Sequence, residues 1–178
     1  KYRESKESFF RYVAKKSSKV NKFFFVNDDD LSKSFFVSAA SNKGKIIYFS
    51  REKFIDEELN SGKESIGDWL QSNFNLENAA AASAIVESQG IAWPLIQRTL
   101  KSFKGVPGRM DYAQEEPFAV VIDYAHTPDS LEKVYQTLIM RASNKKLICG
   151  LGAAGGGRDK WKRPVLGKIA EKYCKKII

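Results

Sequence analysis

The spacing of apolar residues near the start of the chain predicts one helix and then a buried strand. Apolar residues at helical intervals indicate an amphipathic helix over Tyr2 to about Lys16, with Phe9, Phe10 and Val13 on its apolar side. The apolar run Lys22–Val26 predicts a buried strand, which ends in a turn-forming Asn-Asp-Asp-Asp sequence.

Short apolar runs continue through the next fifty residues. The segments Phe35–Ser38 and Lys45–Phe49 predict two further strands. Segment 51–74 has little periodicity, and we assign a short strand to its end, Ile66–Phe74. A helix rich in small residues follows, with Asn75 as its predicted N-cap and Gly90 near its end.

A second helix and a turn-rich loop come next. Pro94 suits the first turn of a helix and predicts one over Leu95–Phe103. The segment Gly105-Val106-Pro107-Gly108-Arg109 is too rich in Gly and Pro for a regular element. We place a domain boundary just after this loop, which gives two domains, 1–109 and 110–178.

The second domain alternates strands and helices. Phe118–Ile122 and Lys146–Gly150 predict strands, and Thr127-Pro128-Asp129 has the cap, first-turn Pro and acid typical of a helix start. Another helix begins at Pro164, and Lys175–Ile178 predicts the start of a strand. This order indicates an α/β fold with a parallel sheet, in which Phe118–Ile122 and Lys146–Gly150 are neighbours. Ligands bind at the carboxyl ends of the strands of such sheets.

The composition and net charge limit the kinds of molecule that we expect this chain to bind. A net charge of +9 over 178 residues favours an anionic ligand, but Lys and Arg alternate with acids along the chain, which disfavours nucleic acid. There is no signal peptide and no apolar run of membrane-spanning length, so we expect a cytoplasmic protein without a membrane partner. Cys149 and Cys174 lack metal-ligand spacing, and we expect buried free thiols in a reducing compartment.

Two polar loops follow the predicted strands of the second domain. Asp123 and His126 lie in the first, where an Asp can contact a ribose hydroxyl and a His can donate to phosphate, although His126 could equally cap the turn. The second loop, Gly152–Pro164, is glycine-rich and basic, which favours an oxyanion or substrate over a plain connection. It contains Arg158 and Lys160 but no Walker A sequence.

Three residues of the first domain carry weaker signals. Asn75 and Asn78 are three residues apart at a helix start, so both amides can read an adenine edge, or Asn75 can simply cap the helix. Lys6 lies among helix charges, and nothing in its surroundings distinguishes it from a solvated lysine.

Taken in order, several segments resemble the Mur ligases of peptidoglycan synthesis, in particular the UDP-N-acetylmuramyl-tripeptide synthetase branch. The resemblance spans essentially all 178 residues, and the two second-domain motifs are the most specific. The segments are Tyr2-Arg3-Glu4-Ser5-Lys6, Asn27-Asp28-Asp29-Asp30, Phe74-Asn75-Leu76-Glu77-Asn78, Gly105-Val106-Pro107-Gly108-Arg109-Met110, Asp123-Tyr124-Ala125-His126-Thr127-Pro128-Asp129 and Gly155-Gly156-Gly157-Arg158-Asp159-Lys160.

The resemblance implies an enzyme that uses ATP and Mg²⁺ to join diaminopimelate or lysine to UDP-N-acetylmuramoyl-L-alanyl-D-glutamate through an acyl phosphate. It implies that a carbamylated Lys6 holds Mg²⁺ and that Asn75 and Asn78 contact adenine. It further implies that Arg109 and Asp123 contact the nucleotide and that His126 lies on the phosphate side as a catalytic residue. Arg158 and Lys160 would contact the incoming amino acid.

The same resemblance defines the expected extent of the chain. Residues 1–109 would be the C-terminal portion of a central ATP-binding domain, and 110–178 the first half of a Rossmann-like C-terminal domain. The family's P-loop is absent from the sequence, so we expect an inactive fragment of a monomeric, active parent. The alternatives are a folylpolyglutamate-type or cyanophycin-type ligase, or a non-catalytic basic module that binds nucleic acid.

Overall fold

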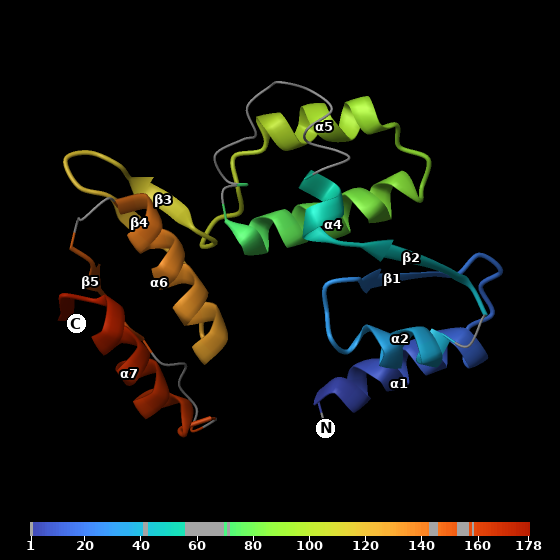
Figure 1. Ribbon diagram of the computed structural model, residues 1–178, viewed down its shortest axis with the longest axis horizontal. Coiled ribbons are helices and arrows are strands. Elements are labelled where there is room, and N and C mark those ends of the chain that lie inside the picture. The colour runs from blue at the N-terminus through green and yellow to red at the C-terminus, as the bar shows by residue number, and fades with distance from the viewer. Residues whose placement is uncertain are drawn as a thin grey trace. The chain divides into compact units, whose positions relative to one another are not determined.

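The computed structural model describes residues 2–40, 43–55, 70, 72–142, 146–152, 157 and 159–178. The chain divides into two compact units, Lys1–Lys104 and Gly105–Ile178. Both units contain helices and short strands (Figure 1). Among the described residues, the strands pair two by two into three small sheets.

The first unit contains a parallel pair of strands and the helix that joins them. β1 (Phe23–Asn27) pairs with β2 (Lys45–Phe49), both close to their predicted positions. Parallel strands need a crossover connection, because the chain must return to the same end of the sheet. α2 (Lys33–Ala40) provides this crossover, so the strand predicted at Phe35–Ser38 is wrong: the run is helical.

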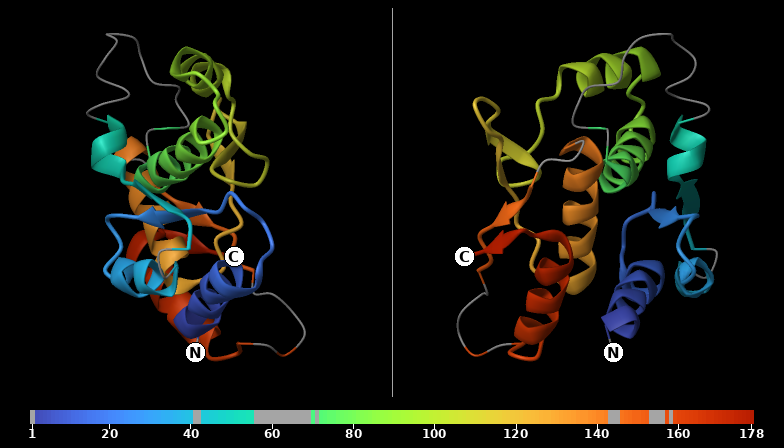
Figure 2. Two further views of the ribbon diagram at one scale, coloured as in Figure 1. Left: turned by 90° about the vertical axis from the view of Figure 1, so that its right-hand side faces the viewer. Right: turned by 60° about the vertical axis from the view of Figure 1, so that its left-hand side comes forward.

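The first helix covers this strand pair. α1 (Tyr2–Lys16) has its predicted bounds, and it packs beside α2 (Figure 2). Phe10, Val13 and Ala14 pack with Phe24 of β1 in one apolar cluster. Phe9 was predicted on this apolar side, but it is 64% exposed, because residues 10, 13 and 14 form the helix stripe that faces the strands.

Three helices complete the first unit: α3 (Arg51–Lys53), α4 (Asn73–Glu87) and α5 (Trp93–Ser102). α5 begins beside Pro94 as predicted. Asn75 is not the N-cap of α4: that position is Ser72, and the Asn75 N–H donates to the Ser72 carbonyl oxygen at 3.0 Å. Most of the strand predicted at Ile66–Phe74 lies outside the described residues, and its last two residues begin α4.

The second unit begins with a hairpin that the sequence did not indicate. β3 (Asp111–Gln114) pairs antiparallel with β4 (Val120–Ile122). β5 (Ile148–Cys149) pairs in parallel with β6 (Lys176–Ile177). Within the described part of the chain, β4 and β5 are therefore not hydrogen-bonded neighbours, contrary to the prediction. The polar sequence Asp-Tyr-Ala-Gln of β3 has no apolar alternation, so this competing partner was missed.

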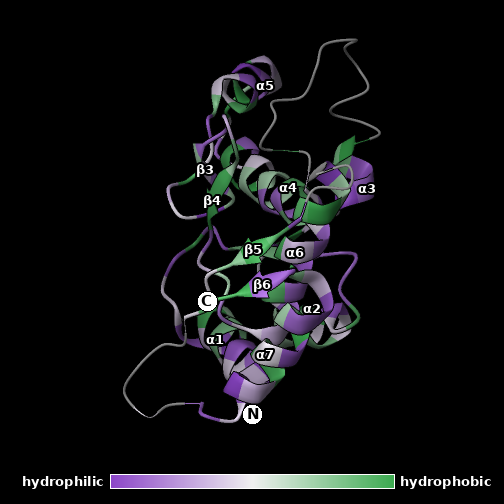
Figure 3. Cartoon of the chain, turned by 90° about the vertical axis from the view of Figure 1, so that its left-hand side faces the viewer, coloured by the Kyte–Doolittle hydropathy of each residue, from purple (hydrophilic) through white to green (hydrophobic). Residues whose placement is uncertain are grey.

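Two helices pack beside these strands: α6 (Pro128–Ala142) and α7 (Lys162–Tyr173). The predicted stripe of α6 is confirmed, with Leu131, Val134 and Tyr135 buried and Leu138 partly buried. Figure 3 shows β4 and β5 as uniformly apolar strands.

A polar contact also joins the two helices. Lys172 of α7 donates to the Glu132 carboxylate of α6 at 3.0 Å, and the Tyr173 hydroxyl donates to the same oxygen at 2.8 Å. These hydrogen bonds lower the pKa of Glu132, that from Lys172 contributing most, because they favour the charged carboxylate.

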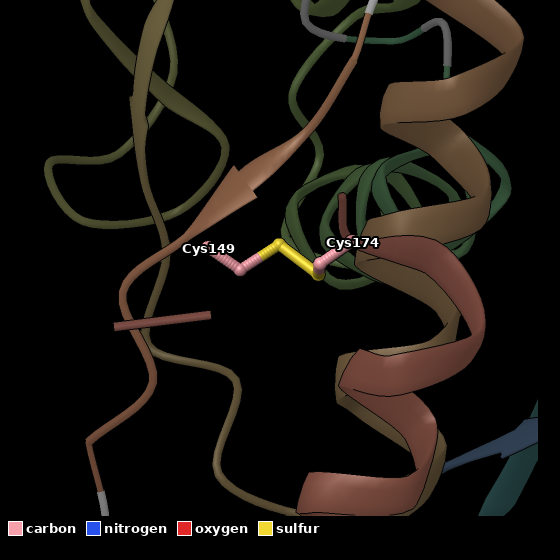
Figure 4. Close-up of a disulfide and its surroundings, with 2 residues drawn as sticks. All are labelled: Cys149 and Cys174. Carbon is pink, nitrogen blue, oxygen red and sulfur yellow. A yellow bond between two sulfur atoms is a disulfide. The ribbon is translucent and has the colours of Figure 1, made fainter. Parts of the chain in front are cut away.

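A disulfide joins β5 to the end of α7 (Figure 4). Cys149 and Cys174 are bonded, with their Cα atoms 6.0 Å apart, so the prediction of two free thiols is wrong. The parallel pairing of β5 with β6 is the physical reason, since Cys174 lies between α7 and β6 and is therefore brought beside β5.

Candidate functional site

The Asp123 carboxylate ties together two loops of the second unit. One of its oxygens accepts the Met110 N–H at 2.8 Å, and the other accepts the Ala125 N–H at 2.7 Å. The Tyr124 N–H donates to the Gly108 carbonyl at 2.9 Å, which adds a second link between the loops. Met110 adopts a φ of +48°, which is costly for a residue with a side chain, and the clamp by Asp123 holds it there.

Three exposed side chains line up above this clamp. The Arg109 guanidinium lies 5.0 Å from the Tyr124 ring centre, and the Tyr124 ring lies 5.0 Å from the His126 imidazole. The first contact is a cation–π interaction and the second a tilted ring contact. Arg109 and His126 thus both contact the Tyr124 ring, next to Asp123 in the sequence. We call Arg109, Tyr124 and His126 the cation–aromatic row.

Tyr124 is the member of this row to which the sequence analysis gave no role. Exposure alternates along the chain after β4, with Asp123 and Ala125 half-buried and Tyr124 and His126 exposed. That two-residue spacing between an aromatic residue and the histidine was the signal available in the sequence.

The helix that follows the row starts where it was predicted. The Thr127 hydroxyl accepts the Ser130 N–H at 3.3 Å, and the Ser130 hydroxyl accepts the Thr127 N–H at 3.1 Å. This reciprocal cap, together with the bond from the Leu131 N–H to the Thr127 carbonyl, makes Thr127 the N-cap of α6. Thr127 rather than His126 therefore caps the helix. The His126 imidazole is exposed, but its Nδ1 lies 3.0 Å from the Tyr124 carbonyl oxygen and its ring packs on Tyr124, so it also contacts the turn, as the alternative interpretation expected.

The other candidate residue of the second unit that can be placed is Lys160. It is exposed, in the turn before α7. Lys162 and Arg163 belong to the first turn of α7 rather than to the loop, and Lys162 pairs with Asp159 at 2.8 Å. Arg158 lies outside the described residues.

The candidate residues of the first unit are on two different helices. Lys6 is exposed on α1, with its ammonium 5.5 Å from the Tyr2 ring centre. Asn75 is half-buried and Asn78 exposed, one turn apart on α4.

The acidic turn after β1 is held by contacts of its own. Asp29 accepts the Arg51 N–H at 2.9 Å, Asp28 pairs with Lys33 at 2.8 Å, and Asp30 accepts both the N–H and the hydroxyl of Ser32. The Ser32 bonds lower the pKa of Asp30, the hydroxyl contributing most. Over the described residues, no group of three or more His, Cys, Asp or Glu side chains could hold a metal ion. Within the same limits, no helix is long and apolar enough to cross a membrane.

The mixed α/β fold is one that Mur ligases have. The crystal structure of MurF from Acinetobacter baumannii matches it with a TM-score of 0.70 over 99% of this chain and 41% of that chain. At 19% identity, this match shows the fold alone.

Sequence similarity identifies the family. The model of the Mur ligase glutamate ligase domain matches residues 108–178. A UDP-N-acetylmuramoyl-L-alanyl-D-glutamate--2,6-diaminopimelate ligase from Syntrophomonas wolfei is 36% identical over 97% of this chain. A ligase of the same name from Aquifex aeolicus is 44% identical over 72% of it. The chain belongs to the Mur ligase family, and it spans 37% and 25% of the length of these two relatives.

Proposed function

We propose that this chain is part of an ATP- and Mg²⁺-dependent ligase that adds 2,6-diaminopimelate to UDP-N-acetylmuramoyl-L-alanyl-D-glutamate. The observation that carries the proposal is the similarity, over nearly the whole chain, to relatives whose names state this activity. The family resemblance makes residues 1–109 the end of the central ATP-binding domain and 110–178 the start of the C-terminal domain. Because the enzyme consumes ATP and a UDP-linked precursor, we assign it to the cytoplasm. We also expect it to act as a monomer.

The cation–aromatic row supports a nucleotide site. An exposed aromatic face can stack on a base, and a guanidinium can pair with phosphate oxygens. ATP, when bound, supplies the phosphoryl group that turns the D-glutamyl carboxylate into an acyl phosphate. Arg109 and Asp123 would contact the nucleotide, and Asn75 and Asn78 would contact adenine. Arg158 and Lys160 would bind the incoming amino acid.

The metal site needs residues beyond those described. A carbamate on Lys6 would form when its neutral amine attacks CO₂ and releases a proton, which converts a cation into an oxygen ligand suited to Mg²⁺. Since the described residues hold no metal-binding group, we assign Lys6 as one ligand only and derive no step through the metal.

The activity is tested on the full-length protein by phosphate release from ATP. We expect release that depends on the UDP-linked dipeptide and on diaminopimelate. No release would overturn the ligase proposal, and a preference for lysine would overturn the amino-acid assignment.

The role of Lys6 is tested with a matched pair of variants on α1. Lys6→Ala should lose activity that added Mg²⁺ with bicarbonate does not restore, whereas Lys15→Ala, at an exposed lysine of the same helix, should keep it. The wild-type protein should give a carbamate signal in ¹³C NMR after incubation with ¹³C-bicarbonate. Full activity of Lys6→Ala would refute the carbamate role.

A further inference from the structure

The hydrogen bond of His126 determines which of its ring nitrogens carries the proton. Nδ1 of His126 lies 3.0 Å from the main-chain carbonyl oxygen of Tyr124. A carbonyl oxygen only accepts hydrogen bonds, so Nδ1 must be the donor. A neutral imidazole has one N–H, and Nε2 is then left with a lone pair and no proton.

The ring is held in this orientation from a second side. The Tyr124 ring packs against the imidazole at 5.0 Å, with Arg109 on the same Tyr124 ring. The Asp123 clamp fixes the backbone from which both rings project. Arg109 and Asp123 are the charged groups of this cluster, and the Asp123 carboxylate accepts main-chain N–H groups rather than a hydrogen bond from the imidazole.

We infer that His126 uses Nε2 as a hydrogen-bond acceptor for a hydroxyl or amine of a nucleoside, while Arg109 serves the anionic part of the ligand. Tyr124 is a positioning residue, since its carbonyl sets the tautomer and its ring restrains the imidazole. This assignment differs from a phosphate-side role for His126, because neutral Nε2 would face a phosphate oxygen with its lone pair. The identity of the ligand rests on the proposed function, but the tautomer does not.

The tautomer can be measured on the ligand-free chain. His126 is the single histidine, so ¹⁵N-histidine labelling gives signals from this ring alone. We expect a protonated Nδ1 and an unprotonated Nε2 in spectra recorded under conditions where the ring carries one proton. Tyr124→Phe keeps both the carbonyl and a ring, and it should give the same spectrum. A dominant Nε2–H tautomer in the wild-type chain would overturn the inference.

Ligand chemistry provides a second test with the same signals. Adenosine should shift the Nε2 resonance while leaving this nitrogen unprotonated, and inorganic phosphate should leave it unchanged. Protonation of Nε2 by added phosphate would overturn the acceptor role.

Two variants of the full-length enzyme distinguish a hydrogen-bond acceptor at position 126 from a hydrogen-bond donor. The side-chain carbonyl of Gln can accept at the position of Nε2, whereas Lys can only donate. We expect His126→Lys to raise the KM for ATP about tenfold more than His126→Gln does, which is the factor for one lost hydrogen bond. A lower KM for ATP in His126→Lys than in His126→Gln would show that residue 126 donates a hydrogen bond to phosphate. An enzyme without ligase activity would refute the proposed function but leave the NMR result standing.

Discussion

Breaking the Cys149–Cys174 bond should destabilise the second unit. The bond closes a loop of sequence separation 25, which contains the basic loop and all of α7. A cross-link restricts the unfolded chain more than the folded one, and for a loop of this length the loop-entropy model gives about 3 kcal/mol. Dithiothreitol supplies the two electrons: the disulfide becomes two thiols, and the dithiol becomes a cyclic disulfide.

The loss can be measured by thermal unfolding in the presence and absence of the reductant. For a unit of this size, each kcal/mol shifts Tm by about 4–8 °C, so we expect Tm to fall by about 12 °C or more. Cys174→Ala should reproduce this shift without reductant. Cys149 is 6% exposed and belongs to the core with Leu131 and Ala170, so Cys149→Ala should cost slightly more because it also leaves a cavity.

The double variant distinguishes a bond from two separate thiols. If the cysteines are bonded, Cys149→Ala with Cys174→Ala should be no less stable than Cys149→Ala alone, within about 0.5 kcal/mol. Additive losses, an unchanged Tm on reduction, or two thiols that alkylate in the unreduced protein would each refute the cross-link.

Three further predictions concern glycines, the loop clamp and pH. Gly44→Ala should lower the free energy of unfolding by about 1–3 kcal/mol in a denaturant titration, because a Cβ would lie 2.6 Å from the Lys22 carbonyl oxygen. Gly167→Ala, in open space within α7, should raise the free energy of unfolding by about 0.5–1 kcal/mol. Asp123→Asn should lower the free energy of unfolding by about 1.5–3 kcal/mol in the same assay, because the single oxygen of an amide cannot replace both carboxylate oxygens that accept main-chain N–H groups. Asp129→Asn, at an exposed carboxylate, is the control, and an equal loss in this variant would contradict the clamp. The pKa of Glu132 lies below the 4.5 of a free side chain, so the ionised carboxylate contributes its full stabilisation above pH 4.5 and loses it as pH falls through the lowered pKa. The difference in Tm between wild type and Glu132→Gln should therefore shrink as the pH is lowered through this range. A difference that stays constant would refute the assignment.

Part of the candidate site could be predicted from the sequence because its contacts join residues that are close in the sequence. Thr127, Pro128 and Ser130 are close in sequence, so the start of α6 follows from capping rules. The family resemblance assigns Arg109, Asp123 and His126 to the nucleotide together with Asn75 and Asn78, and in the structure Arg109 and His126 contact the same ring, that of Tyr124. The structure also changes how Asp123 is understood, since both of its oxygens accept main-chain N–H groups.

Two of the errors in secondary structure share one cause. Phe35–Ser38 has the composition of a strand, but it connects parallel strands and must be a crossover. β3 has no apolar alternation, and it forms because β4 offers it a partner. Pairing over a distance therefore overrode local pattern at both places.

The sequence by itself determined the elements whose signals are local: α1, β1, β2, α5 and α6, the turn-rich loop at 105–109, and the motifs that identify the family. Only the tertiary structure decided the disulfide, the pairing of the strands, and the clamp beneath the cation–aromatic row. The disulfide joins residues 25 positions apart, the clamp joins Met110 to Asp123, and the pairing of β5 with β6 joins Ile148 to Lys176. Helix periodicity and capping act within a few residues, whereas a long-range contact depends on how the whole unit packs.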